Sequence, residues 1–222
     1  MRRWTLVSAL SGLLILAGCG GGSDNTSPAS LNGRLLPVSQ LPGFKVSRTF
    51  EWDNPTDVFV QGLFTSETTT PSEFIHSLDK AGFDAGAGEQ VQKKGNHGPQ
   101  GFADVLKFKS DGGAQDALVL IHKEDLKQPC YSACSQNPGE FSVSGIPGAK
   151  AAQQVPLKNP PKGAGPPFVG YAVEFPIRSY VYIVNAGGPP GSVTKSEVTK
   201  AAKAFYAHAT TLSNSGSSGS GY

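Results

Sequence analysis

The side chains best suited to disulfide, metal or acid–base chemistry in this sequence are three cysteines and four histidines. No two histidines have the His-x-x-x-His spacing of a zinc site, and none stands in a Glu-containing metalloprotease motif. We expect the three histidines in helical segments to be partly exposed, and the one in a polar Gly-Pro loop to be solvated. The helical ones are His76, His122 and His208, and the one in the loop is His97. The sequence therefore predicts no catalytic residue, no metal ligand and no cofactor.

The first cysteine follows a segment typical of export signals. Arg2 and Arg3 begin the chain, an apolar run extends from Leu6 to Leu16, and small residues precede Cys19. A charged start, a short apolar region and small residues are the parts of a signal peptide. A transmembrane helix needs about 20 apolar residues, so this apolar run is too short to span a bilayer.

The residues Leu16-Ala17-Gly18-Cys19 resemble the lipobox of bacterial lipoproteins at all four positions. The resemblance implies that residues 1–18 are cleaved, that Cys19 becomes the mature N-terminus, and that this cysteine carries a diacylglyceryl group and commonly a further fatty acyl chain. Two or more acyl chains hold a protein stably on a membrane. We therefore expect a lipid-anchored protein on the extracytoplasmic side of the cell membrane; a plain secreted protein is the alternative.

Cys130 and Cys134 are the two cysteines that remain after acylation of Cys19. An even pair in an exported protein favours a disulfide, and the Pro, Ser, Asn and Gly residues around this pair indicate a turn that can bring them together. The Cys-x-x-Cys spacing of redox proteins is missing, and no second ligand pair is present for zinc. A structural disulfide between Cys130 and Cys134 is the favoured interpretation.

The composition divides the chain into one folded domain with polar ends. Residues 19–34 are rich in Gly, Ser and Thr and are expected to form a flexible linker, and residues 213–222 a disordered Gly and Ser tail. The remaining segment, 35–212, is long enough for one core. Loss of Arg2 and Arg3 leaves 17 basic and 17 acidic residues, so no basic surplus favours nucleic acid as a partner.

Three segments have the caps and periodicity of helices. Thr70-Pro71-Ser72-Glu73 and Thr194-Lys195-Ser196-Glu197 are capping boxes that begin two of them, and the third runs from Gly113 to Asp125. In the last helix Lys195, Lys200 and Lys203 lie away from the apolar stripe. We interpret this lysine face as solvated surface, with docking to anionic lipid as the alternative.

Runs of aromatic and β-branched residues predict the strands. These runs are 57–65, 102–109, 141–144, 168–175 and 179–185, and the last two are close enough to form a hairpin joined by Pro176-Ile177-Arg178. The expected fold is a single α+β domain, with a mostly antiparallel β-sheet of about five or six strands packed with three α-helices. Tyr171, Phe175, Tyr180 and Tyr182 are expected mainly in the core.

The globular part is similar to uncharacterised lipoproteins of high-GC Gram-positive bacteria, through Gly145-Ile146-Pro147-Gly148-Ala149, the hairpin over 171–185 and the final Ala-rich helix. The resemblance carries no catalytic residues. We expect a non-enzymatic domain that binds an unknown protein or an apolar ligand, while the membrane is contacted through the lipid on Cys19. An envelope hydrolase with a dispersed active site and a structural surface lipoprotein without a ligand are the alternatives.

Overall fold

A computed structural model describes residues 31–37, 40, 43–60, 70–93, 100–127, 139–159, 162 and 165–215. The helical elements are η1 (Asn32–Arg34), α2 (Pro55–Val60), α3 (Pro71–Lys80), α4 (Asp111–Asp125) and α5 (Lys195–Ser215). The strands are β1 (Phe44–Trp52), β2 (Phe83–Lys93), β3 (Gln100–Phe108), β4 (Gly139–Glu140), β5 (Lys150–Gln154), β6 (Val169–Ile177) and β7 (Tyr180–Gly188).

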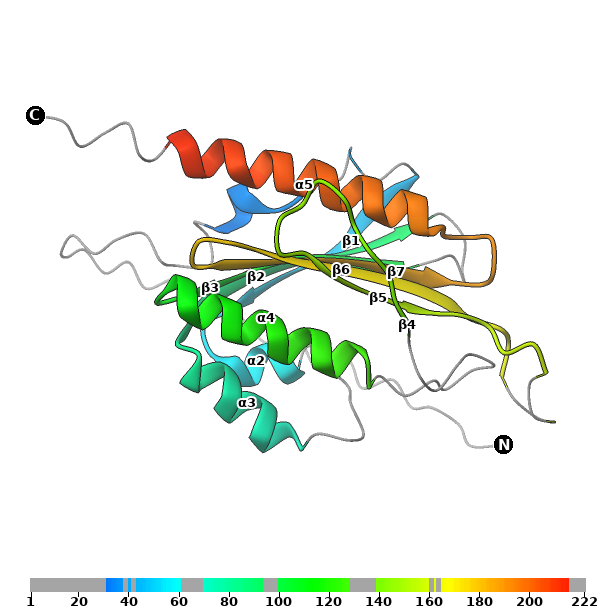
Figure 1. The fold of residues 1–222 in the computed structure, drawn as a ribbon, viewed down its shortest axis with the longest axis horizontal. Coiled ribbons are helices and arrows are strands. Elements are labelled where there is room, and N and C mark those ends of the chain that lie inside the picture. Colours follow the sequence, from blue (N-terminus) through cyan, green and yellow to red (C-terminus); the bar gives the residue numbers. More distant parts are fainter. Residues whose placement is uncertain are drawn as a thin grey trace, which may run out of the picture.

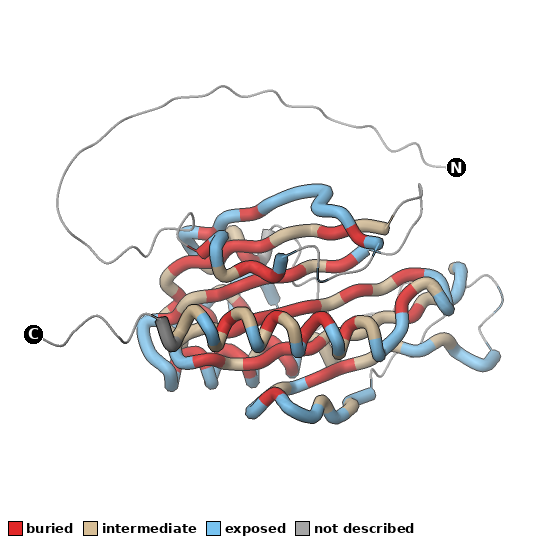
Figure 2. Tube along the Cα trace, turned by 90° about the horizontal axis from the view of Figure 1, so that it is seen from above, coloured by how far each residue is buried: buried red, intermediate tan, exposed pale blue. Residues whose placement is uncertain are grey.

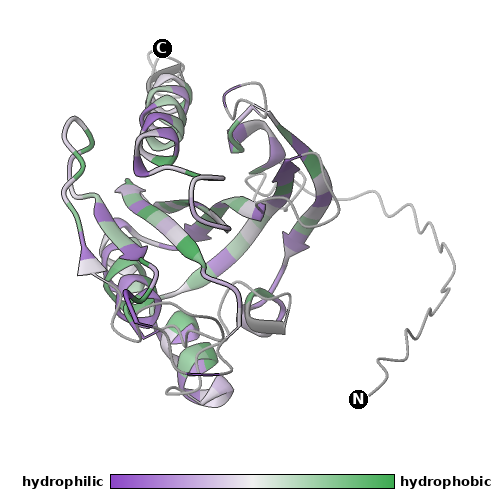
Figure 3. Ribbon diagram, turned by 90° about the vertical axis from the view of Figure 1, so that its right-hand side faces the viewer, coloured by the Kyte–Doolittle hydropathy of each residue, from purple (hydrophilic) through white to green (hydrophobic). Residues whose placement is uncertain are grey.

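The strands form one antiparallel sheet between two layers of helix. The strand order is β1-β2-β3-β7-β6-β5-β4, and every neighbouring pair is antiparallel. Helix α5 and η1 cover one face, and α2, α3 and α4 cover the other (Figures 1 and 3). The α+β class is confirmed, but the described part contains seven strands and four α-helices, more than the five or six strands and three helices expected.

Side chains alternate between the two helical layers along each central strand, so the sheet separates two apolar cores. Val173, Phe175 and Ile177 of β6 join the core under α5, whereas Val181 and Ile183 of β7 join the core against α3 and α4. Seen from the α5 side, much of the central strands and the inner stripe of α5 are buried, whereas the edge strand β1 is mostly exposed (Figure 2). Phe175 and Tyr182 stack with ring centroids 5.3 Å apart and are fully buried, as expected of core aromatics.

Local capping signals set the starts of the three longest helices. The Thr70 and Glu73 side chains form a reciprocal capping box at α3, and Thr194 and Glu197 do the same at α5. Ser110 accepts a hydrogen bond from the Gly113 N–H and caps α4, so this helix begins at Asp111, two residues before the predicted start. These helix predictions are confirmed.

Two strand predictions are wrong. The run over 57–65 was expected to be extended, but Pro55–Val60 is helical, because Asn54 accepts a hydrogen bond from the Asp57 N–H and Pro55 favours a helix start; the rest of the run lies outside the described residues. The second run, 141–144, is a turn-rich connection after the two-residue strand β4. In contrast, strands β1, β2, β4 and β5 were not predicted.

The hairpin between β6 and β7 is tighter than expected. Ile177 pairs with Tyr180, so its turn consists of Arg178 and Ser179, and Arg178 takes a left-handed φ of 53°. Pro176 stays inside β6 because β5 pairs with β6 only as far as Glu174. Its missing N–H therefore leaves no ladder hydrogen bond unmade.

The described domain starts inside the segment expected to be a linker. Leu31 is 1% exposed and Leu36 is also 1% exposed, and both belong to the core under α5. The N–H of the His208 ring donates to the Gly33 carbonyl over 2.9 Å, which ties η1 to α5. At the other end, α5 continues to Ser215, past the expected boundary at 212. No helix among the described residues is long and apolar enough to cross a membrane.

Candidate functional site

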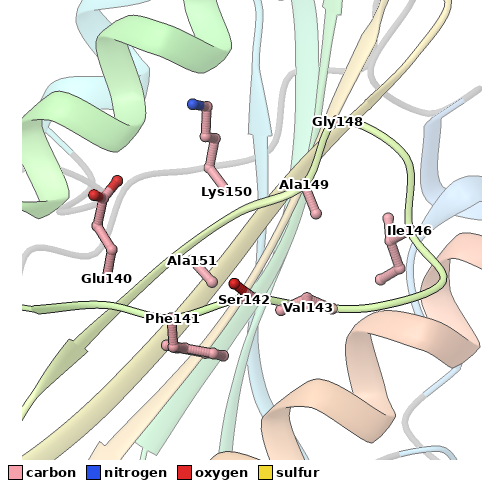
Figure 4. A pocket seen from close by; sticks show the side chains of 9 residues that line it. All are labelled: Glu140, Phe141, Ser142, Val143, Ile146, Gly148, Ala149, Lys150 and Ala151. Carbon is pink, nitrogen blue, oxygen red and sulfur yellow. The ribbon is translucent and has the colours of Figure 1, made fainter.

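The segment from Gly139 to Ala151 lies at one edge of the sheet and contacts both helical layers. Glu140 pairs with Ala152, and the Phe141 N–H donates to the Ala151 carbonyl over 3.1 Å. Successive residues of this extended segment point to opposite faces, so Glu140 faces α4 and Phe141 packs against the core under α5. Figure 4 shows Glu140 and Lys150 on the α4 side, and Val143 and Ile146 on the α5 side.

On the α4 side, the His122 ring lies between two carboxylates. Its Nε2 is 2.7 Å from Oε1 of Glu140, and its Nδ1 is 3.2 Å from Oε2 of Glu174. His122 is 6% exposed and Glu174 is fully buried, whereas the Glu140 side chain is 64% exposed. Both nitrogens can donate to carboxylates at once only in the doubly protonated ring. The three side chains thus connect the last turn of α4 to β4 and β6.

A third carboxyl group, Asp125, is partly buried and completes this cluster. Burial raises the pKa of Asp125 well above its usual range, and the neighbouring Glu174 raises it further. Burial also raises the pKa of Glu174, although Asp125 opposes the rise. The rise is larger at Asp125, so of the two groups Asp125 keeps its proton to the higher pH.

The exposed member of the cluster is ionised more readily than an ordinary glutamate. The hydrogen bond from His122 and the charge of that ring lower the pKa of Glu140. The site thus joins two carboxyl groups with raised pKa values to a carboxylate at the surface through one imidazole. No hydroxyl or thiol of a described residue has a hydrogen bond to His122, so this part of the chain places no nucleophile beside the ring.

Two open grooves border the same segment. The first, of about 500 Å³, lies within the bend from Glu140 to Ala151 and is lined by polar residues such as Ser142 and Lys150 together with apolar ones such as Val143 and Ile146. The second, of about 450 Å³, lies between Phe141 and α5. Its α5 side is formed by Lys195, Ser196, Thr199, Lys200 and Lys203. Both grooves are open, and neither is an enclosed apolar cavity.

A separate buried carboxylate lies near the middle of the sheet. Asp104 on β3 is fully buried, and neither of its oxygens has a hydrogen-bond partner. Burial, and next the negative charge of Glu89, raise the pKa of Asp104 well above its usual range. Gly88 on the neighbouring strand leaves the room that this carboxyl occupies, since a Cβ there would meet Asp104 Oδ1.

The structure separates the histidines as predicted but changes the role of one. His76 is exposed and His208 partly exposed, whereas His122 is buried, contrary to the expectation of a surface residue. The ring faces the sheet because α4 packs over β6, and a buried imidazole needs polar partners, which Glu174 and Glu140 supply. His97, Cys19, Cys130 and Cys134 lie outside the described residues. Within the described ranges no three His, Cys, Asp or Glu side chains are arranged to hold a metal ion.

Two acidic members of the cluster, Glu140 and Glu174, were missed because they are distant from His122 in sequence. Glu140 lies 18 residues and Glu174 52 residues from His122. The one local signal was a charge inside an apolar strand, as in Ala172-Val173-Glu174-Phe175 and in Ala103-Asp104-Val105. Such a residue faces a buried surface and is expected to have a special partner or a shifted pKa.

The fold resembles an extracellular domain of known structure. The extracellular domain of PknH from Mycobacterium tuberculosis matches with a TM-score of 0.52 and 14% identity, over 82% of this chain and 96% of that one. An uncharacterised Mycobacterium smegmatis protein, the Rv0999 ortholog, matches with a TM-score of 0.41 and 13% identity, over 84% of this chain and 96% of that one. At such identity the first similarity shows the fold alone.

Sequence comparison gives one short match and no family. A stretch of 73 residues is 34% identical to part of the large terminase subunit of Enterobacteria phage T3. This stretch is 33% of this chain, but the match covers only 11% of the terminase subunit. No established protein family matches the chain.

Proposed function

We propose that this chain is an exported lipoprotein, held on the outer side of the cell membrane by lipid on Cys19, and that its domain binds a partner without catalysing a reaction. The observation that carries the proposal is the similarity of nearly the whole domain to an extracellular domain of known structure. In this sequence the domain follows a segment that resembles a signal peptide with a lipobox. A fold shared with a domain known outside the cell agrees with an export signal that was recognised independently from Arg2 to Cys19.

Growth with a labelled fatty acid tests the anchor. The wild-type chain should be labelled, and Cys19→Ser should carry no label because the acylated sulfur and the cleavage site are lost. Cys130→Ser is the matched control and should be labelled like the wild type. Label that persists in Cys19→Ser would disprove acylation at this cysteine.

The first groove, within the bend from Glu140 to Ala151, is the surface we assign to partner binding. It is open, and Glu140, Ser142 and Lys150 line it beside apolar residues, which fits a polypeptide better than an apolar ligand that needs an enclosed pocket. Among the described residues, the large apolar side chains that are most exposed are Val46, Val119, Val155 and Leu157.

Site-specific crosslinking on cells tests this surface. A photo-reactive amino acid at Lys150, which is exposed and lines the first groove only, should give a discrete protein adduct. The same amino acid at Ser72, exposed on α3, is the control and should give none. The absence of an adduct at Lys150 would instead support a surface lipoprotein without a partner.

One observation favours a second candidate function, an envelope hydrolase. His122 lies between two carboxylates, an arrangement in which a histidine acts as a general base when one ring nitrogen is free for the substrate. Here both nitrogens are occupied. Ester, amide and phosphodiester substrates should therefore be turned over by neither the wild type nor His122→Gln, and turnover that disappears in His122→Gln would replace the binding proposal.

A further inference from the structure

The two helical layers expose charges of opposite sign. The chain from Cys19 onward is nevertheless neutral overall, with 17 basic and 17 acidic residues. Helix α5 exposes three lysines, and its only carboxylate, Glu197, is bonded to Lys93 over 3.2 Å and caps its own helix. The opposite layer exposes four carboxylates and two lysines on α3 and α4: Glu73, Asp79, Asp111, Asp116, Lys80 and Lys123. The exposed charges of α5 are therefore positive, whereas those of α3 and α4 sum to −2.

The three lysines of α5 form one surface with an aromatic ring. Lys195, Lys200 and Lys203 line the groove that also contains Phe141, and Lys195 Nζ lies 5.3 Å from the centre of the Phe141 ring. All three lysines are exposed, and none forms a salt bridge with a carboxylate of the described residues. Ammonium groups around a partly exposed aromatic ring suit a boundary between anionic headgroups and acyl chains.

The chain enters the domain beneath this same helix. Leu31 is the first residue of the structure, and η1 is bound to α5 through the hydrogen bond between His208 and Gly33. His208 follows Lys203 by five residues, or about 8 Å along a helix axis. Leu31 lies twelve positions after Cys19, a stretch that reaches at most about 40 Å, so a lipid on Cys19 would hold the α5 face within reach of the membrane.

From these two observations we propose that the α5 face, with Lys195, Lys200, Lys203 and Phe141, docks on the anionic lipid surface in which the chain is anchored. The inference rests on the lipid anchor of the proposed function and adds an orientation to it. The acidic layer of α3 and α4 then faces away from the membrane, since a negative surface repels it. The tether supplies the high local concentration that allows three lysines to act, although they are fewer than an untethered lipid-binding segment needs.

The test uses the full lipidated chain inserted into vesicles of phosphatidylcholine, with and without phosphatidylglycerol. An amine-reactive reagent is applied, and modification of each lysine is read by mass spectrometry. Modification of Lys195, Lys200 and Lys203 should fall about fivefold when phosphatidylglycerol is present and should recover in high salt. The controls Lys80 and Lys123, on the opposite layer, should be modified equally on both vesicles. Equal modification of the α5 lysines on both vesicles, or protection of the controls instead, would overturn the proposal.

A second measurement separates this inference from the anchor itself. A chain that fails to float with phosphatidylcholine vesicles has no working anchor, and the proposed function then fails. In that case flotation with phosphatidylglycerol vesicles decides the inference. The triple variant Lys195→Gln, Lys200→Gln, Lys203→Gln should float less than Lys80→Gln, Lys109→Gln, Lys123→Gln, which has the same net charge. Equal flotation of the two variants would refute docking through α5.

Discussion

The Nε2 atom of His122 lies 2.7 Å from Oε1 of Glu140, so the last turn of α4 holds the two-residue strand β4 at the edge of the sheet. Without this contact β4 has few fixed points, because only Gly139 and Glu140 pair with β5. The contact matters for the proposed binding surface because both grooves border the segment that follows Glu140.

Substituting Glu140→Gln should loosen this segment. Glutamine can still accept a hydrogen bond from His122, but the charge that strengthens the bond is lost. We expect faster hydrogen exchange of the Phe141 amide, which donates to Ala151, while Glu51→Gln on β1 should leave that amide unchanged. The pKa of Glu140 is lowered in the fold. The contribution of Glu140 to stability should therefore be fully present above the ordinary pKa of glutamate, and should be lost as the pH falls through the lowered pKa of the folded state. An unchanged Phe141 exchange rate in Glu140→Gln would show that the contact does not hold β4.

The carboxyl pair below His122 has the opposite pH dependence. The pKa values of Asp125 and Glu174 are raised in the fold, so the native state holds protons that the unfolded chain releases. Stability from this pair should be complete below the pKa of the unfolded groups and be lost as the pH rises through the folded values. Asp125→Asn removes one ionisation. Denaturant unfolding over a pH series should show a smaller fall in stability at high pH, and an unchanged slope would contradict a raised pKa of Asp125 in the fold.

Asp104 should make the domain less stable at neutral pH than an uncharged residue would. Its buried oxygens have no partner, so folding requires the carboxyl to take up a proton that the unfolded chain has lost. Asp104→Asn should therefore raise the free energy of unfolding at pH 7 by about 2 kcal/mol, or about 4 to 8 °C in Tm. Most of the gain should be lost near pH 4, where about half of the unfolded aspartates also hold their proton.

Asp116→Asn, exposed on α4, is the control for the same change in charge and should alter Tm little. Thermal unfolding followed by circular dichroism at both pH values gives the comparison. A Tm gain for Asp104→Asn that is equal at pH 4 and pH 7 would mean that ionisation of Asp104 is not its cause.

Elements with local signals were predictable from the sequence. The boxes formed by Thr70 with Glu73 and by Thr194 with Glu197 use residues three apart, and both helices begin where predicted. Strand β2 carries no such signal, because Gly86 and Gly88 have low strand propensity. Their role depends on packing from another strand: a Cβ at Gly86 would lie 2.7 Å from the Trp52 ring.

The candidate site was less predictable than the fold because its parts meet only through the sheet register. Glu174 faces α4 rather than α5 because β6 pairs with β7 as Glu174 with Ile183, and Ile183 lies in the core against α4. His122 acquires its partners from this pairing, and the helical pattern around it gives no sign of them. The sequence pattern identified the lysines of α5 as one face of the helix. Their proposed role in membrane docking also depends on the position of η1 beside α5, and no local pattern indicates that position.

Two adjacent glycines in the first turn of α4 should respond oppositely to alanine. A Cβ on Gly113 would meet the Ala81 carbonyl oxygen, the backbone at the end of α3, whereas a Cβ on Gly112 has only Ser110 Oγ near it, at 3.9 Å. Gly112→Ala should stabilise the domain by up to about 1 kcal/mol through helix propensity. Gly113→Ala gains the same propensity but must push α3 away from α4, so a net loss of about 1 to 3 kcal/mol is expected.

Thermal unfolding of the two variants side by side measures this difference, since each adds the same methyl group to the same helical turn. The expected Tm shifts are a rise of up to about 4 °C for Gly112→Ala and a fall for Gly113→Ala. A shift of the same sign in both would show that α3 and α4 can separate at little cost, because the Ala81 carbonyl would then have yielded to the new Cβ. The packing of α3 against α4 is therefore tested by the difference between the two glycines.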